Sequence, residues 1–153
     1  MSKRSVIHEG LERFARAAGM EKKSGTWYRQ GDEVVAVVDL QKSQYGQQYY
    51  FNLGFWLREL GADRYPKGLR CHISVRLETL APEERHRIAR LLDLDHEIPG
   101  EQRVDELVAL FNERTLPLIE RGSSVVGLRA LVDEGALRAA AIRGPAQQVL
   151  AAA

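Results

Sequence analysis

Apolar residues recur along the first third of the chain with two different spacings. A spacing of three and four residues, typical of a helix with one buried face, joins Ile7, Leu11, Phe14 and Ala18. Gly19 is well placed to end this helix in a left-handed conformation. Beyond it the apolar spacing changes to two, which is typical of strands. The pattern therefore predicts an N-terminal helix that leads into a sheet.

Four strands are expected in this sheet. The first spans residues 26–29 and turns into a second at 33–41, whose segment Val34–Val38 is apolar on both faces and belongs in the sheet interior. A third strand is expected at about 47–57 and a fourth at about 70–78, after a loop that contains glycine and proline. Short connections between neighbours favour an antiparallel meander.

Three to four helices are expected to follow the sheet and to cover one of its faces. Pro82 suits the first turn of one helix, and Pro117 ends or kinks another that begins near residue 101. Ser123 or Ser124 can cap a further helix. This order of elements predicts the α+β class.

A single domain over residues 1–135 accounts for these elements, because a chain of 153 residues has the size of one ordinary domain. Residues 136–153 are rich in alanine and favour a helix, but Gly144 and Pro145 interrupt it. We expect this C-terminal tail to be helical and to be loosely docked or frayed.

Charge and composition narrow the classes of function. The chain has 22 Lys and Arg against 21 Asp and Glu, so no overall field attracts nucleic acid or acidic lipid, and nucleic-acid binding is disfavoured. One cysteine excludes an internal disulfide framework and fits a reducing compartment. We find neither a secretory signal pattern nor a stretch near the ~20 apolar residues of a membrane helix. These features predict a cytoplasmic protein that does not cross a membrane.

The sheet face opposite the predicted core carries the most informative chemistry. Strand alternation places polar and aromatic side chains of three strands on it: Asp39 and Gln41; Tyr50, Asn52 and Trp56; and Arg70, His72, Ser74 and Arg76. Aromatic rings supply contact area, amides supply directed hydrogen bonds, and arginine and histidine bind an anion or a carboxylate. The pattern indicates a recognition surface, although antiparallel sheets also have ordinary solvated faces of this kind.

Other chemistry-bearing residues do not form a motif. Asp39 and the adjacent pair Gln41 and Lys42 partly match a nuclease core, but a regular strand turns these two neighbours to opposite faces. The acidic loop at 93–97 lacks the spacing of a calcium loop. Cys71 is expected to point into the core as a small apolar residue. The sequence identifies no catalytic residue, metal site or cofactor motif, and it favours a protein that is not an enzyme while leaving catalysis open.

Several short strings carry a family resemblance. In order along the chain, they are Gly19–Lys23, Thr26–Arg29, Leu40–Ser43 with Gly46, Tyr50–Gly54 and Leu116–Glu120. They resemble a bacterial family of uncharacterised proteins, the domain of unknown function four-three-zero-four. The resemblance covers most of residues 5–135 and implies a fold and a size but no activity. Its strings coincide with Trp27, Gln41, Lys42, Ser43 and Asn52, all of which belong to the candidate face, its turn or its surroundings.

Functions of different classes are compatible with this sequence. We expect a non-catalytic cytosolic module that binds a protein partner; by analogy of size and class, a toxin-neutralising immunity protein is one version. Its candidate binding residues are Trp27, Asp39, Gln41, Lys42, Ser43, Tyr50, Asn52, Trp56, Arg70, His72, Ser74 and Arg76. The alternative is a small-ligand-binding protein or an enzyme with a concave site around Asp39, Asn52, His72 and Arg76. A homodimer through the sheet face or the C-terminal helices is a third reading.

Overall fold

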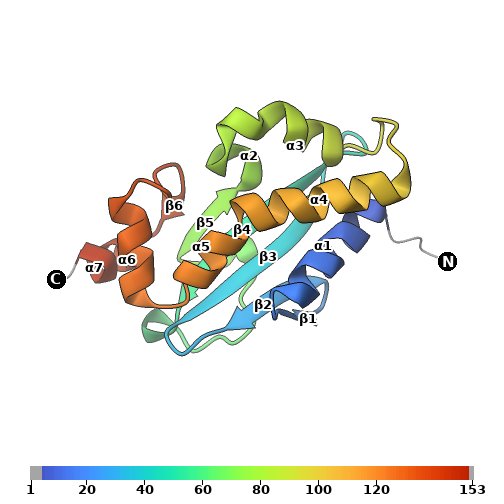
Figure 1. The fold of residues 1–153 in the computed structure, drawn as a ribbon. Coiled ribbons are helices and arrows are strands. Elements are labelled where there is room, and N and C mark those ends of the chain that lie inside the picture. The colour runs from blue at the N-terminus through green and yellow to red at the C-terminus, as the bar shows by residue number, and fades with distance from the viewer. Residues whose placement is uncertain (1–4, 152–153) are drawn as a thin grey trace.

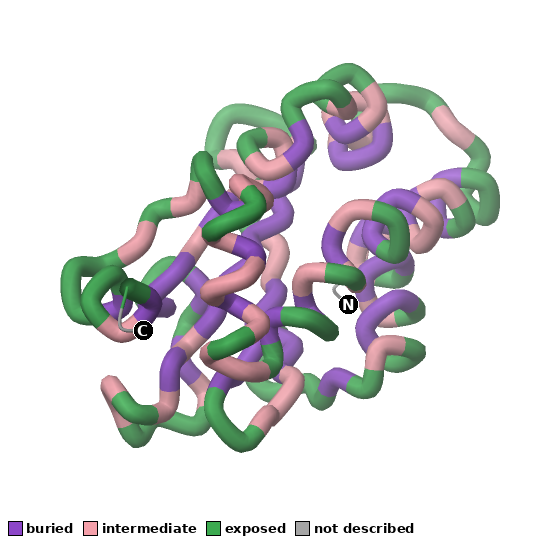
Figure 2. The backbone as a smooth tube through the Cα atoms, turned by 60° about the vertical axis from the view of Figure 1, so that its left-hand side comes forward, coloured by how far each residue is buried: buried purple, intermediate pink, exposed green. Residues whose placement is uncertain are grey.

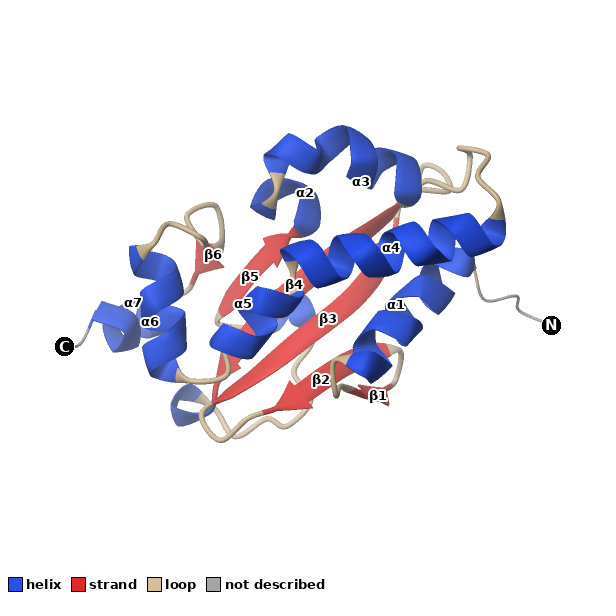
Figure 3. Cartoon of the chain, in the orientation of Figure 1, coloured by secondary structure: helices blue, strands red, loops and turns tan. Residues whose placement is uncertain are grey.

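A computed structural model describes residues 5–151 as a sheet with helices packed against it (Figure 1). Residues 1–4 and 152–153, the outer ends of the predicted domain and tail, lie outside the described residues. Helices α1 (Val6–Ala17), α4 (Gly100–Arg114) and α5 (Leu116–Arg121) lie across one face of the sheet (Figure 3). This arrangement confirms the predicted α+β class with an N-terminal helix and C-terminal helices.

The sheet is an antiparallel meander of six strands, not the predicted four, in the order β1-β2-β3-β4-β5-β6. They span β1 Glu21–Lys23, β2 Thr26–Gln30, β3 Val34–Lys42, β4 Tyr49–Leu57, β5 Ile73–Arg76 and β6 Ala141–Ile142. Strands β1 and β6 are the ones that the sequence pattern did not predict. Both are short edge strands, β1 is exposed throughout, and neither has an apolar face that would mark it.

The remaining helices and turns connect these layers. They are α2 Leu77–Leu80, α3 Arg85–Leu91, α6 Val125–Asp133 and α7 Gly144–Ala151, with short 3-10 turns η1 Arg58–Leu60, η2 Gly68–Arg70 and η3 Pro82–Glu84. Of the two serines that the sequence offers as a cap, Ser124 caps α6: its hydroxyl accepts the Gly127 N–H. No helix in residues 5–151 combines the length and apolar character that a membrane span requires.

The predicted fourth strand is much shorter than expected. Turn η2 precedes it and α2 follows it, so that only Ile73–Arg76 is extended and paired. The 3-10 turn breaks the alternation on which the prediction rested. Leu69 is therefore 60% exposed instead of buried, and Cys71 is buried on the opposite face of the sheet from the main core.

The main core lies between the sheet and helices α1 and α4. Phe14, Phe51 and Phe111 come from α1, β4 and α4, and each is fully buried. The Phe111 ring stacks on Phe51 with centroids 4.6 Å apart and meets the Phe14 ring at 5.5 Å. Figure 2 shows the buried backbone running through the centre of the molecule, with exposed segments around it. Three aromatic side chains thus join the two helices to the middle of the sheet.

The opposite sheet face is not open along its whole length, because the segment 58–72 crosses it. This segment covers a second small core, made of Tyr28, Val35, Val37 and Cys71 with Trp56 and Tyr65 against it. Gly54 permits the close approach, since a Cβ at this position would lie 2.8 Å from the Cys71 sulfur. The Tyr28 hydroxyl donates to the Tyr65 carbonyl at 3.2 Å. Only the remainder of this face can serve as a recognition surface.

The alanine-rich tail, expected to be loosely docked or frayed, packs on the fold. Strand β6 pairs with β5, and Ala146 and Leu150 of α7 are buried. The Arg129 side chain of α6 donates to the carbonyls of Val149 and Leu150. These contacts hold a segment whose sequence carries little apolar pattern.

Candidate functional site

Three neighbouring strands bring polar residues into one row on the partly open sheet face. Asp39 of β3 pairs in register with Asn52 of β4, which pairs with Arg76 of β5. Register partners point to the same face. The Asn52 amide nitrogen donates to Asp39 Oδ1 at 2.9 Å and to Gln41 Oε1 at 3.4 Å. We call Asp39, Gln41, Asn52 and Arg76 the polar row.

The outer end of the polar row is held by its own contacts. Arg76 Nη2 donates to Gln41 Oε1 at 3.2 Å, and the Arg76 guanidinium lies 4.1 Å from the centre of the Tyr50 ring. A cation over an aromatic face is attracted by the ring. Gln41 therefore accepts from both sides and links Asn52 to Arg76. The geometry of these side chains is set before any ligand arrives.

The Asn52 side chain has one unsatisfied atom. Asn52 is only 3% exposed, and its Oδ1 has no hydrogen-bond partner among the described residues. Its orientation is fixed because the amide nitrogen already donates to two oxygens. A buried acceptor without a donor costs about 1–3 kcal/mol. A ligand that donates an N–H or O–H to this oxygen would remove that cost.

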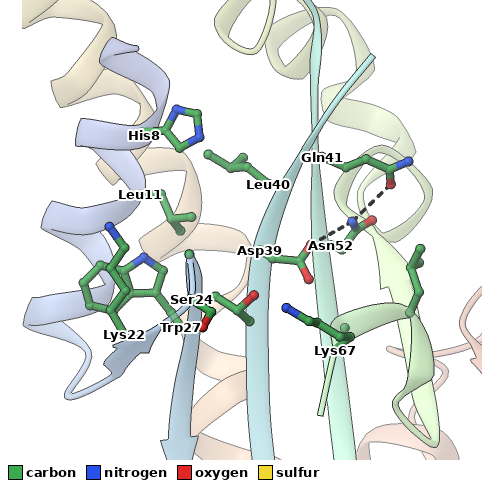
Figure 4. Close-up of a pocket in the computed structure, with 14 residues that line it drawn as sticks. His8, Leu11, Lys22, Ser24, Trp27, Asp39, Leu40, Gln41, Asn52 and Lys67 are labelled. Atoms are coloured by element: carbon green, nitrogen blue, oxygen red, sulfur yellow. Dashed lines mark hydrogen bonds between the residues drawn. The ribbon is translucent and has the colours of Figure 1, made fainter. Parts of the chain in front are cut away.

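A pocket of about 450 Å³ opens beside the polar row, at the point where β2 begins alongside β3 (Figure 4). Its lining comes from α1, from the hairpin that joins β1 to β2, from the β3 segment Asp39–Gln41, from Asn52 and from residues 67–69. We call it the edge pocket. Its volume falls in the range of about 300–1,000 Å³ that is usual for ligand sites.

The edge pocket has an apolar wall and a polar wall. Alternation along β3 turns Leu40 toward the helices and Asp39 toward the opposite face, so the pocket reaches around the strand edge. Figure 4 shows Leu11 and Trp27 on the Leu40 side, and Lys67 with its amino group toward the Asp39 carboxylate. The pocket can therefore contact an apolar group and a hydrogen-bonding group of the same ligand.

Comparison with known proteins identifies the family. The family model for DUF4304, a domain of unknown function, matches residues 11–121. The chain belongs to the DUF4304 family. No curated protein and no solved structure matches it. The match confirms the resemblance carried by the short strings, and it includes the whole polar row. Because the family description assigns no activity, the function of this DUF4304 chain must be argued from the site itself.

The structure of this DUF4304 chain brings some of the predicted site residues together and separates others. Asp39, Gln41, Tyr50, Asn52 and Arg76 meet at the polar row, and Ser74 lines a smaller hollow with Asn52 and Arg76. Trp27 instead faces the helices, in register with Val38, and contributes to the apolar wall of the edge pocket.

Three further candidate residues lie outside the edge pocket. Lys42 and Ser43 lie at the β3–β4 turn, beside a shallow hollow that Tyr50 and Arg76 also line. Arg70 is exposed on η2. None of these three lines the edge pocket.

Trp56 and His72 form a separate pair, in which His72 is the last residue of the 58–72 segment that covers Trp56. Their ring centroids are 4.1 Å apart, and the Trp56 indole donates to the Gly61 carbonyl at 3.0 Å. His72 Nδ1 accepts the Leu57 backbone N–H at 2.9 Å. Burial lowers the pKa of His72, and the Arg143 charge lowers it further. His72 lines neither hollow that Asn52 borders. Its hydrogen bond to Leu57 stabilises the end of β4.

We expect mild acid to destabilise the protein through His72. Because the pKa of folded His72 is lowered, its contribution to stability is present above its unfolded pKa of about 6.5 and is lost as the pH falls through the lower folded pKa. Urea unfolding should therefore give a smaller free energy of unfolding near pH 5 than near pH 7, within the range that histidine titration controls.

Two variants test whether His72 causes this pH dependence of stability. His72→Asn keeps an acceptor for the Leu57 N–H but does not titrate, so its stability should change less between the two pH values. His86→Asn, at an exposed position of α3, should keep the wild-type pH dependence. Identical pH dependence in wild type and His72→Asn would contradict the assignment.

The sequence pattern missed several residues of the edge pocket. Lys67 belongs to a loop, Lys22 and Ser24 to the unpredicted β1 hairpin, and His8 to α1. Their proximity depends on how the helix, the hairpin and the loop pack around β3. No spacing along the chain carries that information.

Proposed function

We propose that this protein is a non-catalytic module that binds a protein partner in the cytosol, through the polar row and the edge pocket. The unpaired Asn52 Oδ1 is the observation that carries the proposal. Asn52 pairs with Asp39 on one side and with Arg76 on the other in a pre-arranged network, so a donor group of the partner would find the acceptor already oriented.

The residue types around the Asn52 oxygen support a protein partner. Arg76 and Tyr50 are stacked and partly exposed, and arginine and tyrosine are enriched at positions that dominate binding energy in protein interfaces. The stacking also lowers the entropy that each side chain would lose on binding. A bacterial immunity-type protein that neutralises a toxin is one form of such a module, on the analogy of size and class.

Affinity capture from the source cells tests the proposal. We expect wild-type protein to retain a specific partner that the Tyr50→Ala/Arg76→Ala double variant loses. Calorimetry with that purified partner should show affinity weakened roughly a hundredfold, since two central interface residues are removed. Arg85→Gln, at an exposed position of α3, provides a control that should bind as wild type does. A partner bound equally by the double variant would place recognition elsewhere and overturn the proposal.

The volume of the edge pocket favours a second candidate, a small-ligand site. About 450 Å³ with one apolar and one polar wall suits a compact molecule that carries a hydrogen-bond donor. A thermal-shift screen of small polar metabolites separates the two candidates. Stabilisation that requires Asn52, together with no partner captured through the polar row, would favour the small ligand.

A further inference from the structure

Strand β3 continues past the end of the strand that pairs with it. Pairing with β2 reaches Val38, whereas pairing with β4 continues to Lys42. From Asp39 to Lys42, β3 therefore has a strand on one side only in the described part of the chain. The edge pocket lies beside this free edge.

The backbone groups of Leu40 and Lys42 point toward the free edge. In an antiparallel sheet, successive residues of a strand direct their N–H and C=O groups to opposite neighbours. The Gly31 N–H donates to the Val34 carbonyl at 3.0 Å on the β2 side. The backbone groups of every second residue after Val34 point to the same side, so those of Leu40 and Lys42 do as well. An exposed edge of this kind is a template for pairing with another chain.

We infer that an extended, acidic segment of the partner protein adds to the sheet here, antiparallel to β3 and in line with β2. The inference rests on the proposed function and names the mode of binding. The backbone of the partner segment would pair with Leu40 and Lys42, in the way that peptides extend exposed sheet edges in other complexes. Main-chain hydrogen bonds supply affinity, and the two walls of the edge pocket supply selectivity.

The pleat of the added strand sets which of its side chains reach each wall. A residue opposite Leu40 points to the helix side, where Leu11 and Trp27 form the apolar wall. Its neighbours point to the other side, toward Asp39 and Lys67. The segment should therefore alternate between apolar and polar residues.

The charge around the pocket selects an acidic segment. Lys22 and Lys67 line the pocket, and among the described residues of its lining Asp39 is the one that is acidic. Lys42 adds a further positive charge on the free edge itself. Opposite charge on the partner speeds association and excludes basic competitors.

A displayed library of short random peptides, selected on the wild-type protein, provides the probe. We expect the selected peptides to alternate apolar and polar residues, to carry Asp or Glu, and to bind with micromolar affinity. Lys42→Pro removes an edge-facing N–H while leaving the hydrogen bonds between β3 and β4 intact. It should weaken binding of the selected peptides roughly tenfold or more.

Lys42→Ala is the matched control, because it removes the same side chain and charge but keeps the backbone N–H. It should bind several-fold more tightly than Lys42→Pro. In the wild-type protein, bound peptide should also slow amide hydrogen exchange at Leu40 and Lys42, a readout that does not depend on either variant folding.

The outcomes separate this inference from the proposed function. Equal affinity for Lys42→Pro and Lys42→Ala, with no slowing of exchange at Leu40 and Lys42, would overturn the strand addition. If the cellular partner still requires Tyr50 and Arg76 in that case, the proposed function stands alone. A library that yields no acidic, alternating binder would also overturn the inference.

Discussion

Replacing Phe111 by alanine is expected to lower the free energy of unfolding by about 4 kcal/mol. The side chain is fully buried in α4 and contacts both Phe51 of the sheet and Phe14 of α1. Its removal would leave a cavity where three elements meet. None of the neighbours can fill that cavity without moving a whole helix or strand, which places this site at the costly end of large-to-small substitutions.

Urea unfolding followed by circular dichroism measures this effect. Phe111→Leu keeps most of the apolar volume and should cost about 1 kcal/mol. Asn112→Ala, at the next and exposed position of α4, should change stability by less than about 0.5 kcal/mol. A loss below about 1 kcal/mol for Phe111→Ala would contradict the packing described between α1, α4 and β4.

The parts of the fold that the sequence predicts are those with strong periodicity. Ile7, Leu11 and Phe14 are buried on one face of α1, as their helical spacing indicates. The segment Val34–Val38 is fully buried within β3, with β2 and β4 on either side, as its two apolar faces indicate. In these segments, local pattern and tertiary burial agree, so the pattern suffices.

The sequence does not predict how loops cover the sheet. Trp56 has the alternation of an exposed face residue, yet the 58–72 segment lies over it and the indole donates to Gly61. Because Gly54 has no side chain, Cys71 can pack directly against its backbone. The β1 and β6 edges depend on pairing with neighbours and carry no apolar alternation of their own. Such features follow from tertiary contacts that no local pattern encodes.

The candidate site, like the fold, follows only in part from the sequence. Alternation assigns Asp39, Asn52 and Arg76 to one face, but only the observed register makes them direct neighbours. A shift of two residues on one strand would keep the face and separate the three side chains. The edge pocket needs a further fact, that pairing with β2 covers β3 only up to Val38, whereas β3 runs on to Lys42. Sequence reasoning thus assigned these residues to one face and could not supply their geometry.

A second large effect is expected at Arg103, a buried charge in α4. Arg103 is 2% exposed and donates to backbone carbonyls of Leu91, at 2.6 Å, and of Arg90, Asp93 and His96. Burial lowers the pKa of Arg103, although an arginine remains charged at neutral pH. Its guanidinium closes the loop between α3 and α4.

Arg103→Met keeps much of the side-chain volume and removes every donor of the guanidinium. We expect the free energy of unfolding to fall by about 3 kcal/mol, because several buried or partly buried carbonyls lose a charged donor at once. The same loop pairs with the β3–β4 turn, where the Tyr49 N–H donates to the Leu92 carbonyl and the Leu94 N–H to the Gln47 carbonyl. Amide exchange at Leu94 should therefore accelerate together with the loss of stability.

Arg103→Lys separates the effect of the hydrogen-bond donors from that of the charge, and Arg114→Met is a matched control. Arg103→Lys retains the charge on a compact ammonium that lacks the planar fork, so it should recover only part of the lost stability. Arg114→Met makes the same change on the same helix, where the arginine forms partly exposed ion pairs with Glu83 and Glu84, and should cost less than about 1 kcal/mol. If Arg103→Met were no more destabilising than Arg114→Met, the carbonyl cluster would contribute little to stability, and the loop would be held by its pairing with the β3–β4 turn instead.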